Sequence, residues 1–179
     1  REDTARVVDL RRRVRAAMER PPVPWTCPQA IASQYMGDPL PVRKARAIAL
    51  KLSVMPTDLW AGQLFAGSMT LEAPRTHYEH GFPDYVTPEE RTRAAARGLS
   101  IRSVFGHIVP DYGRLLTRGL RGIMEDVARQ RVPAPGVAAP TAAEHAFLDA
   151  VDVVLQGVID YAARLAAHYE REAGACSAT

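Results

Sequence analysis

Cysteine is scarce in this chain, whose 179 residues include two, Cys27 and Cys176. Two thiols so far apart in sequence exclude a disulfide-rich scaffold, although a disulfide between them stays an alternative. The sequence also shows no signal peptide and no apolar run long enough to span a bilayer. We therefore expect a protein of a reducing compartment, the cytoplasm, with no membrane partner.

Aromatic residues are also scarce at 7%, and lysines are few, because arginine supplies most of the 23 basic residues. The formal net charge is nevertheless only +3. An arginine stripe can hold phosphate or nucleic acid, but no aromatic-studded sheet or helix-turn-helix pattern accompanies this one. We interpret it as the solvated face of a helix and expect no nucleic-acid partner. The stripe consists of Arg6, Arg11, Arg12, Arg13, Arg15 and Arg20.

The remaining composition, 47% hydrophobic and 24% charged, is typical of a soluble globular domain. Apolar residues recur every three or four positions over 4–19, 41–55, 112–127 and 147–169, which predicts four amphipathic helices. Residues 132–140 form a proline-rich connector between two packed helices, and 59–69 fit a short strand or a buried loop. The predicted fold is mainly α, a single helical domain over 1–179 with at most a short strand near 62–68.

Capping signals mark the starts of three helices. Thr87 with Glu90 and Thr141 with Glu144 have the spacing of capping boxes, and Asp111 is a suitable N-cap. The last predicted helix runs from Thr141 to about residue 172. Its Asp149, Asp152 and Asp160 are expected to serve solubility or to pair with Arg164, whereas its His145 and His168 have no evident partner.

Glycine has a predicted packing role in the helix over 112–127. Tyr112, Leu116, Gly119, Ile123 and Val127 share one face. We expect Gly119 and its neighbour Gly122 to let another backbone approach that face closely.

A histidine-rich stretch, residues 76–80, offers two imidazoles and a carboxylate. With His107, the side chains of His77, Glu79 and His80 would be enough for a metal site. The spacing matches no recognised zinc pattern and no cysteine accompanies it. We therefore interpret the stretch as an exposed polar loop and expect no bound metal.

Five segments resemble, in the same order, the amino-terminal part of the glycyl radical enzymes, which include pyruvate formate-lyase and the diol, choline and hydroxyproline lyases. They are residues 41–47 (PVRKARA), 64–68 (LFAGS), 82–85 (FPDY), 106–112 (GHIVPDY) and 160–166 (DYAARLA). Some positions depart from the family pattern: Gln63 replaces Glu, Ser68 replaces Asn, and Ala32 with its neighbours replaces a Glu-Arg-Ala run. The segment between Tyr85 and Gly106 is also short. These departures indicate a divergent branch whose substrate cannot be inherited from a relative.

The resemblance implies the helical outer wall of an α/β barrel in a lyase or dehydratase that acts on a small polar substrate. Members need a glycine radical, installed by a radical SAM activating enzyme, and a cysteine that becomes a thiyl radical. Neither loop is present, since Cys27 aligns with an early cysteine that carries no radical. We expect no catalytic residue and no directly bound cofactor, and activity only with the remainder of the enzyme, in a homo-oligomer. The sequence begins with Arg, so we also expect a truncated piece of a larger enzyme or one chain of a split one.

His107 is the candidate substrate-binding residue. It lies on a turn after Gly106, and a histidine at the corresponding turn of the diol dehydratases binds a substrate hydroxyl. A neutral imidazole donates from one nitrogen and accepts at the other, which suits an alcohol. A structural hydrogen bond at a helix entrance is the alternative role. The alternative for the whole chain is a non-catalytic helical module that docks on a partner chain.

Overall fold

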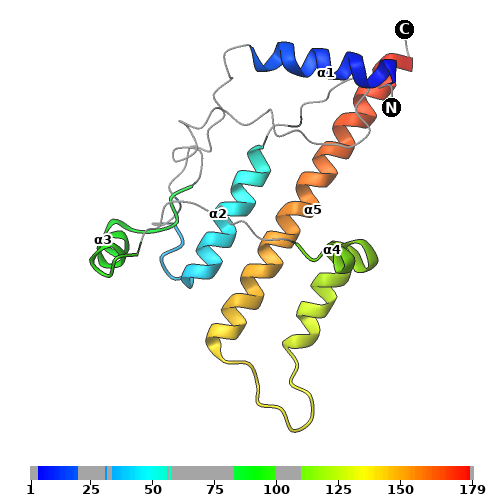
Figure 1. The fold of residues 1–179 in the computed structure, drawn as a ribbon. Helices are drawn as coiled ribbons and strands as arrows, with labels where there is room; N and C mark the ends of the chain where they lie inside the picture. The colour runs from blue at the N-terminus through cyan, green and yellow to red at the C-terminus, as the bar shows by residue number, and fades with distance from the viewer. Residues whose placement is uncertain are drawn as a thin grey trace.

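The computed structural model describes residues 4–19, 31, 34–55, 57, 83–99 and 110–177, and these form five α-helices (Figure 1). No strand occurs among these described residues, which confirms the mainly α prediction; the strand predicted near 62–68 lies outside them. The helices are α1 (Ala5–Met18), α2 (Leu40–Val54), α3 (Pro88–Ala96), α4 (Tyr112–Gln130) and α5 (Ala142–Ser177).

Two helix starts follow directly from local capping chemistry. The Thr87 hydroxyl accepts from the Glu90 amide at 3.2 Å, and the Glu90 carboxylate accepts from the Thr87 amide at 3.0 Å. The same reciprocal bonds join Thr141 and Glu144 at 3.3 and 2.7 Å. Both capping boxes are therefore confirmed. Helix α5 continues to Ser177, past the end predicted near residue 172.

The core of the described region lies between α2 and α5, which run side by side in Figure 1. Val42 and Ala45 of α2 pack with Ala146 and Ala150 of α5. Three of these four side chains are single methyl groups, so the two helix backbones come close together.

The buried face of α5 differs from the predicted stripe at its first position. Phe147 was placed on the core face, but it is 62% exposed, while its neighbours Ala146 and Leu148 are each 6% exposed. The prediction for Phe147 is wrong because Ala146 and Ala150, rather than Phe147, pack against α2 at this end of α5. Small side chains, rather than the largest apolar ones, set that contact.

At Gly157, α5 comes very close to α2. A β-carbon at Gly157 would lie 3.1 Å from both Cα and Cβ of Ala49. Since one of these atoms is backbone, it could not move aside without shifting the helix. A glycine inside a helix costs about 1 kcal/mol relative to alanine, so its presence here reflects the close approach.

We expect Gly157→Val to lower the free energy of unfolding by about 1–3 kcal/mol, because the larger side chain must push α2 and α5 apart. Gly174→Val is the matched control, since Gly174 lies on the same helix and a β-carbon placed on it would have no atom within 4 Å. Urea unfolding followed by circular dichroism measures both variants. If the two variants were equally stable, the contact between residue 157 and Ala49 would not limit the size of the side chain at position 157.

An ion pair fastens α3 to α2. Arg43, only 4% exposed, donates to both carboxylate oxygens of Glu90 at 2.9 and 2.5 Å and to the Tyr85 carbonyl at 3.2 Å. The Arg43 guanidinium, followed by the Thr87 amide, lowers the pKa of Glu90 to about 2. This contact brings together two segments of the glycyl radical enzyme resemblance, 41–47 and 82–85, which are far apart in sequence.

Candidate functional site

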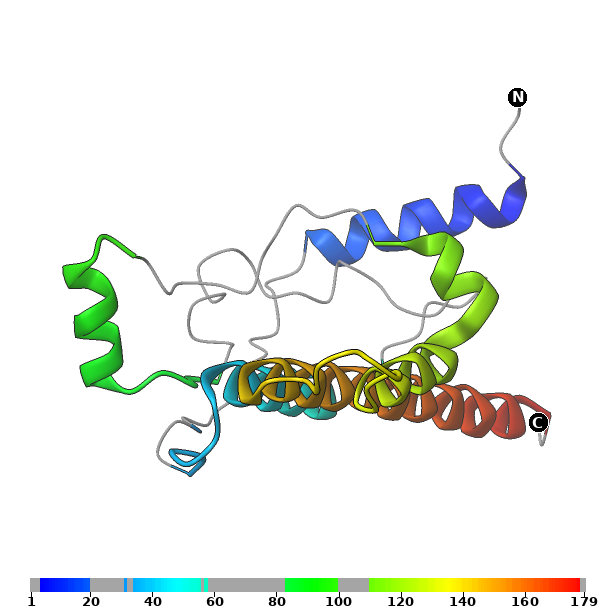
Figure 2. The ribbon, with the colours of Figure 1, turned by 90° about the horizontal axis from the view of Figure 1, so that it is seen from below.

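Helix α4 consists of two half-helices that meet at Gly119, where φ is 64° and ψ is 173°. This backbone conformation is accessible essentially only to glycine. The first half (residues 112–118) turns away from the layer formed by α2 and α5, as Figure 2 shows, while the second half (residues 120–130) packs beside α5. The chain therefore changes direction sharply within a segment that the apolar pattern predicted to be one straight helix.

The predicted packing role of the two glycines has no counterpart among the described residues, and it stays a prediction for the remainder of the enzyme. Within the part of the chain that the structure describes, no atom beyond the neighbouring backbone of α4 lies within 4 Å of a β-carbon built on Gly119. A β-carbon on Gly122 would meet the Arg118 side chain of the same helix at 3.2 Å. Gly119 is needed for its backbone angles, and the close helix approach occurs instead at Gly157.

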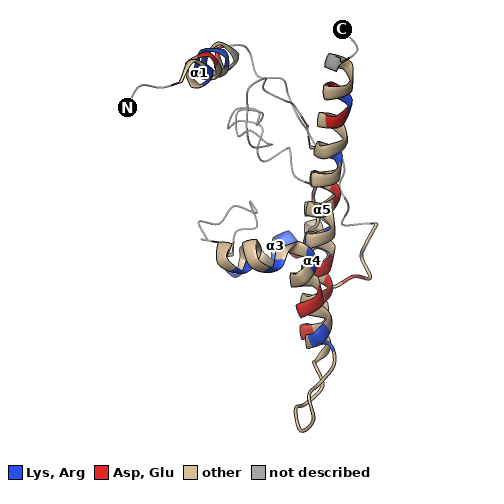
Figure 3. Ribbon diagram, turned by 90° about the vertical axis from the view of Figure 1, so that its right-hand side faces the viewer, with Lys and Arg blue, Asp and Glu red and all other residues tan. Residues whose placement is uncertain are grey.

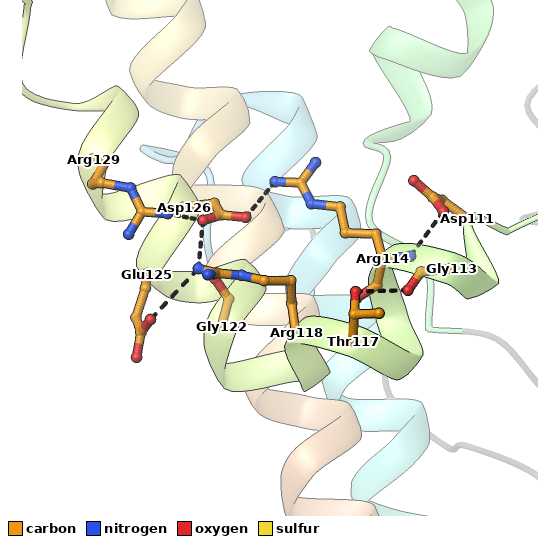
Figure 4. Close-up of polar contacts among 9 residues, drawn as sticks. All are labelled: Asp111, Gly113, Arg114, Thr117, Arg118, Gly122, Glu125, Asp126 and Arg129. Atoms are coloured by element: carbon orange, nitrogen blue, oxygen red, sulfur yellow. Dashed lines mark hydrogen bonds and ion pairs between the residues drawn. The ribbon is translucent and has the colours of Figure 1, made fainter.

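Asp126 holds the two halves of α4 together, as Figure 4 shows. Its Oδ2 accepts from Arg114 at 2.6 Å, and its Oδ1 accepts from Arg118 at 2.8 Å and also from Arg129. The Asp126 side chain is 15% exposed, so these contacts are partly shielded from water. The Arg114 hydrogen bond, followed by the charges of Arg118 and Arg129, holds the pKa of Asp126 below its usual value.

The bend exposes the apolar side of the first half of α4 and turns its basic side toward the second half. Arg114 and Arg118, one turn apart, face Asp126, whereas Tyr112 and Leu116, on the other side, are 59% and 83% exposed. These two residues were predicted to continue the apolar stripe of Ile123 and Val127. That prediction is wrong for the structure because the bend separates the two ends of the stripe.

Asp111 begins α4 as its N-cap, as predicted, with its carboxylate accepting from the Arg114 amide at 2.9 Å. His107 precedes this cap in the sequence, but residues 100–109 lie outside the described part of the chain. Its substrate-binding role therefore stays a prediction. Asp111 fixes where the helix starts and hence where the segment carrying His107 joins α4.

A groove of about 700 Å³ lies along α5 between α2 and the second half of α4. Its apolar lining includes Ala49, Leu50, Met124 and Val153. Its charged lining residues are Arg46, Asp152, Asp160 and Arg164, and the remaining residues that line it are Ile31, Gln34, Tyr35, Ser53, Gln156 and Gly157.

The charged groups around the groove already have partners. Arg46 donates to Asp38 at 2.6 Å, and Asp160 accepts from Gln156 at 2.7 Å. Asp152 accepts from Arg131 at 2.7 Å. Arg46 and Asp152 are thus paired with opposite charges, whereas Asp160 accepts from a neutral amide.

Arg164 pairs with none of Asp149, Asp152 and Asp160, so of the two roles expected for these aspartates, the pairing with Arg164 is wrong. Arg164 donates to the carbonyls of Leu52 and Met55, the former at 3.1 Å, and so satisfies carbonyls at the end of α2. Asp149 and Asp152 bind Arg131 instead, at 2.6 and 2.7 Å. Figure 3 shows acidic and basic positions interspersed along α5.

His168, for which the sequence indicated no partner, has a defined contact in the structure. His168 Nδ1 and the Thr57 hydroxyl share a hydrogen bond at 2.8 Å, and His168 Nε2 lies 3.7 Å from Glu172. With Arg164, this contact clamps the carboxyl end of α2 to α5. His145 is half-buried near the start of α5.

Residues 76–80 lie outside the described part of the chain, as does Cys27. Within the described residues, no three histidine, cysteine, aspartate or glutamate side chains are grouped as metal ligands would be. None of the described helices combines the length and the apolar character that a bilayer span requires.

The helical bundle and its capped α4 entrance therefore define a mainly α protein. In a comparison with known protein families, residues 73–178, more than half of the chain, match the family described as pyruvate formate lyase-like. The chain belongs to this family, within the glycyl radical enzyme superfamily. Searches of curated proteins and of solved structures found no match.

Sequence reasoning missed Asp126 and Gly157 as organising residues. Gly119 and Gly122 mark a possible bend in a helix, and that signal was available in the sequence. The contact between Asp126 and Arg114 has no helical spacing, so it follows only from the bend. The same is true of the contact between Gly157 and Ala49, which depends on how α5 lies against α2.

Proposed function

We propose that this chain forms the amino-terminal helical part of a glycyl radical lyase or dehydratase acting on a small polar substrate. The observation that carries the proposal is the family match over residues 73–178. This range includes α3, α4 and α5 and also Gly106 and His107, for which the sequence predicts a turn. The helices act as a support, and the turn before α4 supplies the substrate contact.

In this proposal His107 orients a substrate hydroxyl, donating from one imidazole nitrogen or accepting at the other. The radical glycine and the reacting cysteine belong to the remainder of the enzyme, in the same chain or a separate one. A radical SAM activating enzyme installs the radical, and this chain is inactive alone. The assembled enzyme is a cytoplasmic homo-oligomer.

A second candidate function is a non-catalytic helical module that docks on a partner chain. Apolar side chains near the α4–α5 connection favour it: Val132 is 73% exposed, and Val137 and Phe147 are each 62% exposed. Such a group of exposed apolar residues is typical of an interaction surface. The two candidates differ in whether the complex holds a radical and turns over a substrate.

Reconstitution tests the proposal. The chain is combined with the polypeptide that carries the radical glycine and the reacting cysteine, and with the activating enzyme under anaerobic conditions. We expect a glycyl radical signal in electron paramagnetic resonance and turnover of at least one member of a panel of 1,2-diols, choline and hydroxyproline. This chain alone should give neither. A complex that binds but turns over no substrate supports the module, and full activity of the other polypeptide without this chain contradicts the proposal.

A further inference from the structure

The groove borders the line along which α4 would continue if it were straight. Met124, in the second half of α4, borders the groove together with Gln156, and the lining continues along α5 to Arg164. Helices α4 and α5 run in opposite directions, because Arg131 at the end of α4 bonds to Asp149 near the start of α5. A straight α4 would therefore continue from Met124 toward the part of α5 around Arg164.

The register of such a straight α4 follows from the contacts that exist. Each residue advances both helices by about 1.5 Å, so each step toward the start of α4 matches one step toward the end of α5. Counting from Arg131 and Asp149, Leu116 would come level with Arg164. The α5 surface at that level carries Ala163 and Ala166, which are both exposed. Small side chains there leave room for a third helix.

Apolar surface that is exposed in the bent form would be covered in the straight one. In a continuous helix Leu116, Leu120, Met124 and Val127 follow one another at spacings of three and four, and so share a face. Val127 is already buried and Met124 borders the groove, whereas Leu116 is 83% exposed. Straightening would bring Leu116 onto α5 on the same side as these two residues.

The charged side chains of α4 are compatible with that arrangement. Arg121, which is exposed, lies seven residues after Arg114 and so shares its face of a continuous helix. Arg114 and Arg118 lie on the side of α4 opposite Leu116, so they would point to solvent. A straight α4 would thus have an apolar face toward the groove and a basic face toward water.

The bent form depends on two local features, the glycine-only backbone angles at Gly119 and the three arginines on Asp126. We propose that α4 is a hinged helix whose first half, residues 112–118, is the occupant of the groove on α5. Asp126 holds the bent state, and release of its arginines lets α4 straighten at Gly119 and dock Leu116 against α5. The inference concerns this chain alone and does not depend on the proposed enzyme function.

Double electron–electron resonance, which measures the distance between two spin labels on the chain, tests the hinge. Spin labels are attached at Thr117→Cys and Glu170→Cys, with Cys27 and Cys176 replaced by serine. Gly119→Ala should raise the population with the short label separation, relative to the population with the long one, by about tenfold or more. The reason is that alanine is disfavoured at the backbone angles of Gly119. Asp126→Asn should move this ratio of populations in the same direction, because it weakens the contacts with all three arginines.

Two further variants separate docking from simple loosening. Leu116→Asp in the Gly119→Ala background should restore the long separation, since the charge cannot enter the groove. Gly136→Ala is the matched control, because Gly136 also has a positive φ, 81°, but lies in the connector. The proposal is overturned if Asp126→Asn leaves the separation unchanged, or if Leu116→Asp leaves it short. Circular dichroism checks folding, and Asp126→Asn decides the outcome if Gly119→Ala does not fold.

Discussion

His107→Ala is expected to lower turnover of the assembled enzyme by about a hundredfold, the scale of losing a positioned proton-transfer group. The expectation rests on the proposed substrate contact of His107 in the turn before α4. An imidazole that orients a hydroxyl can also help to move a proton as that hydroxyl departs. Turnover is measured together with the glycyl radical signal, which should keep its wild-type intensity because the radical glycine lies elsewhere.

The matched control is His145→Ala, which removes the same type of side chain from the start of α5. We expect its turnover to stay within about twofold of the wild type, as for a substitution away from the chemistry. Unchanged turnover in His107→Ala would reduce that residue to a structural role at the helix entrance. Loss of the radical signal would instead show that His107 is needed for assembly.

Arg43→Leu is expected to destabilise the fold by about 2 kcal/mol, below the roughly 3–5 kcal/mol typical of fully buried pairs because the Glu90 side chain keeps some exposure. The substitution removes both Arg43–Glu90 bonds and the bond to the Tyr85 carbonyl. Arg46→Leu, on the same helix, is the control. Its pair with Asp38 has side chains 40% and 31% exposed, so we expect a loss of less than about 1 kcal/mol.

The same pair predicts a dependence of stability on pH. In the folded protein Arg43, followed by the Thr87 amide, lowers the pKa of Glu90 from 4.5 to about 2, so the folded state favours the ionised carboxylate. The stabilisation is fully present above pH 4.5, and is lost as the pH falls toward 2. Urea unfolding between these pH values should show a steeper loss in the wild type than in Arg43→Leu. Equal slopes would mean that the pair contributes no net stability.

Local interactions explain why several elements could be predicted from the sequence. Thr87 and Thr141 each bond to a glutamate three residues later, and Asp111 bonds to the amide of Arg114. Such bonds depend on a few consecutive residues, so the sequence pattern contains all the information they need. The family resemblance is of the same kind, because it rests on ordered short segments of the chain.

The bend at Gly119 illustrates what a pattern cannot decide. The apolar stripe over 112–127 fits a straight helix, and the straight helix would also satisfy the spacing rules. The bent form exists because Asp126 meets Arg114, a residue that would lie more than three helical turns away in a straight helix. The contact becomes possible only after the chain has turned, so its energy does not appear in any local window of the sequence.

The sequence by itself determined the helical class, the capped starts of α3, α4 and α5, and membership of the glycyl radical enzyme superfamily, because these follow from contacts within a few residues and from ordered motifs. Tertiary structure decided which face of α5 is buried, why Gly157 must be small, where Arg164 and Arg131 find their partners, and how α4 bends. Each of these depends on a neighbouring helix whose distance and rotation are set by packing of the whole bundle.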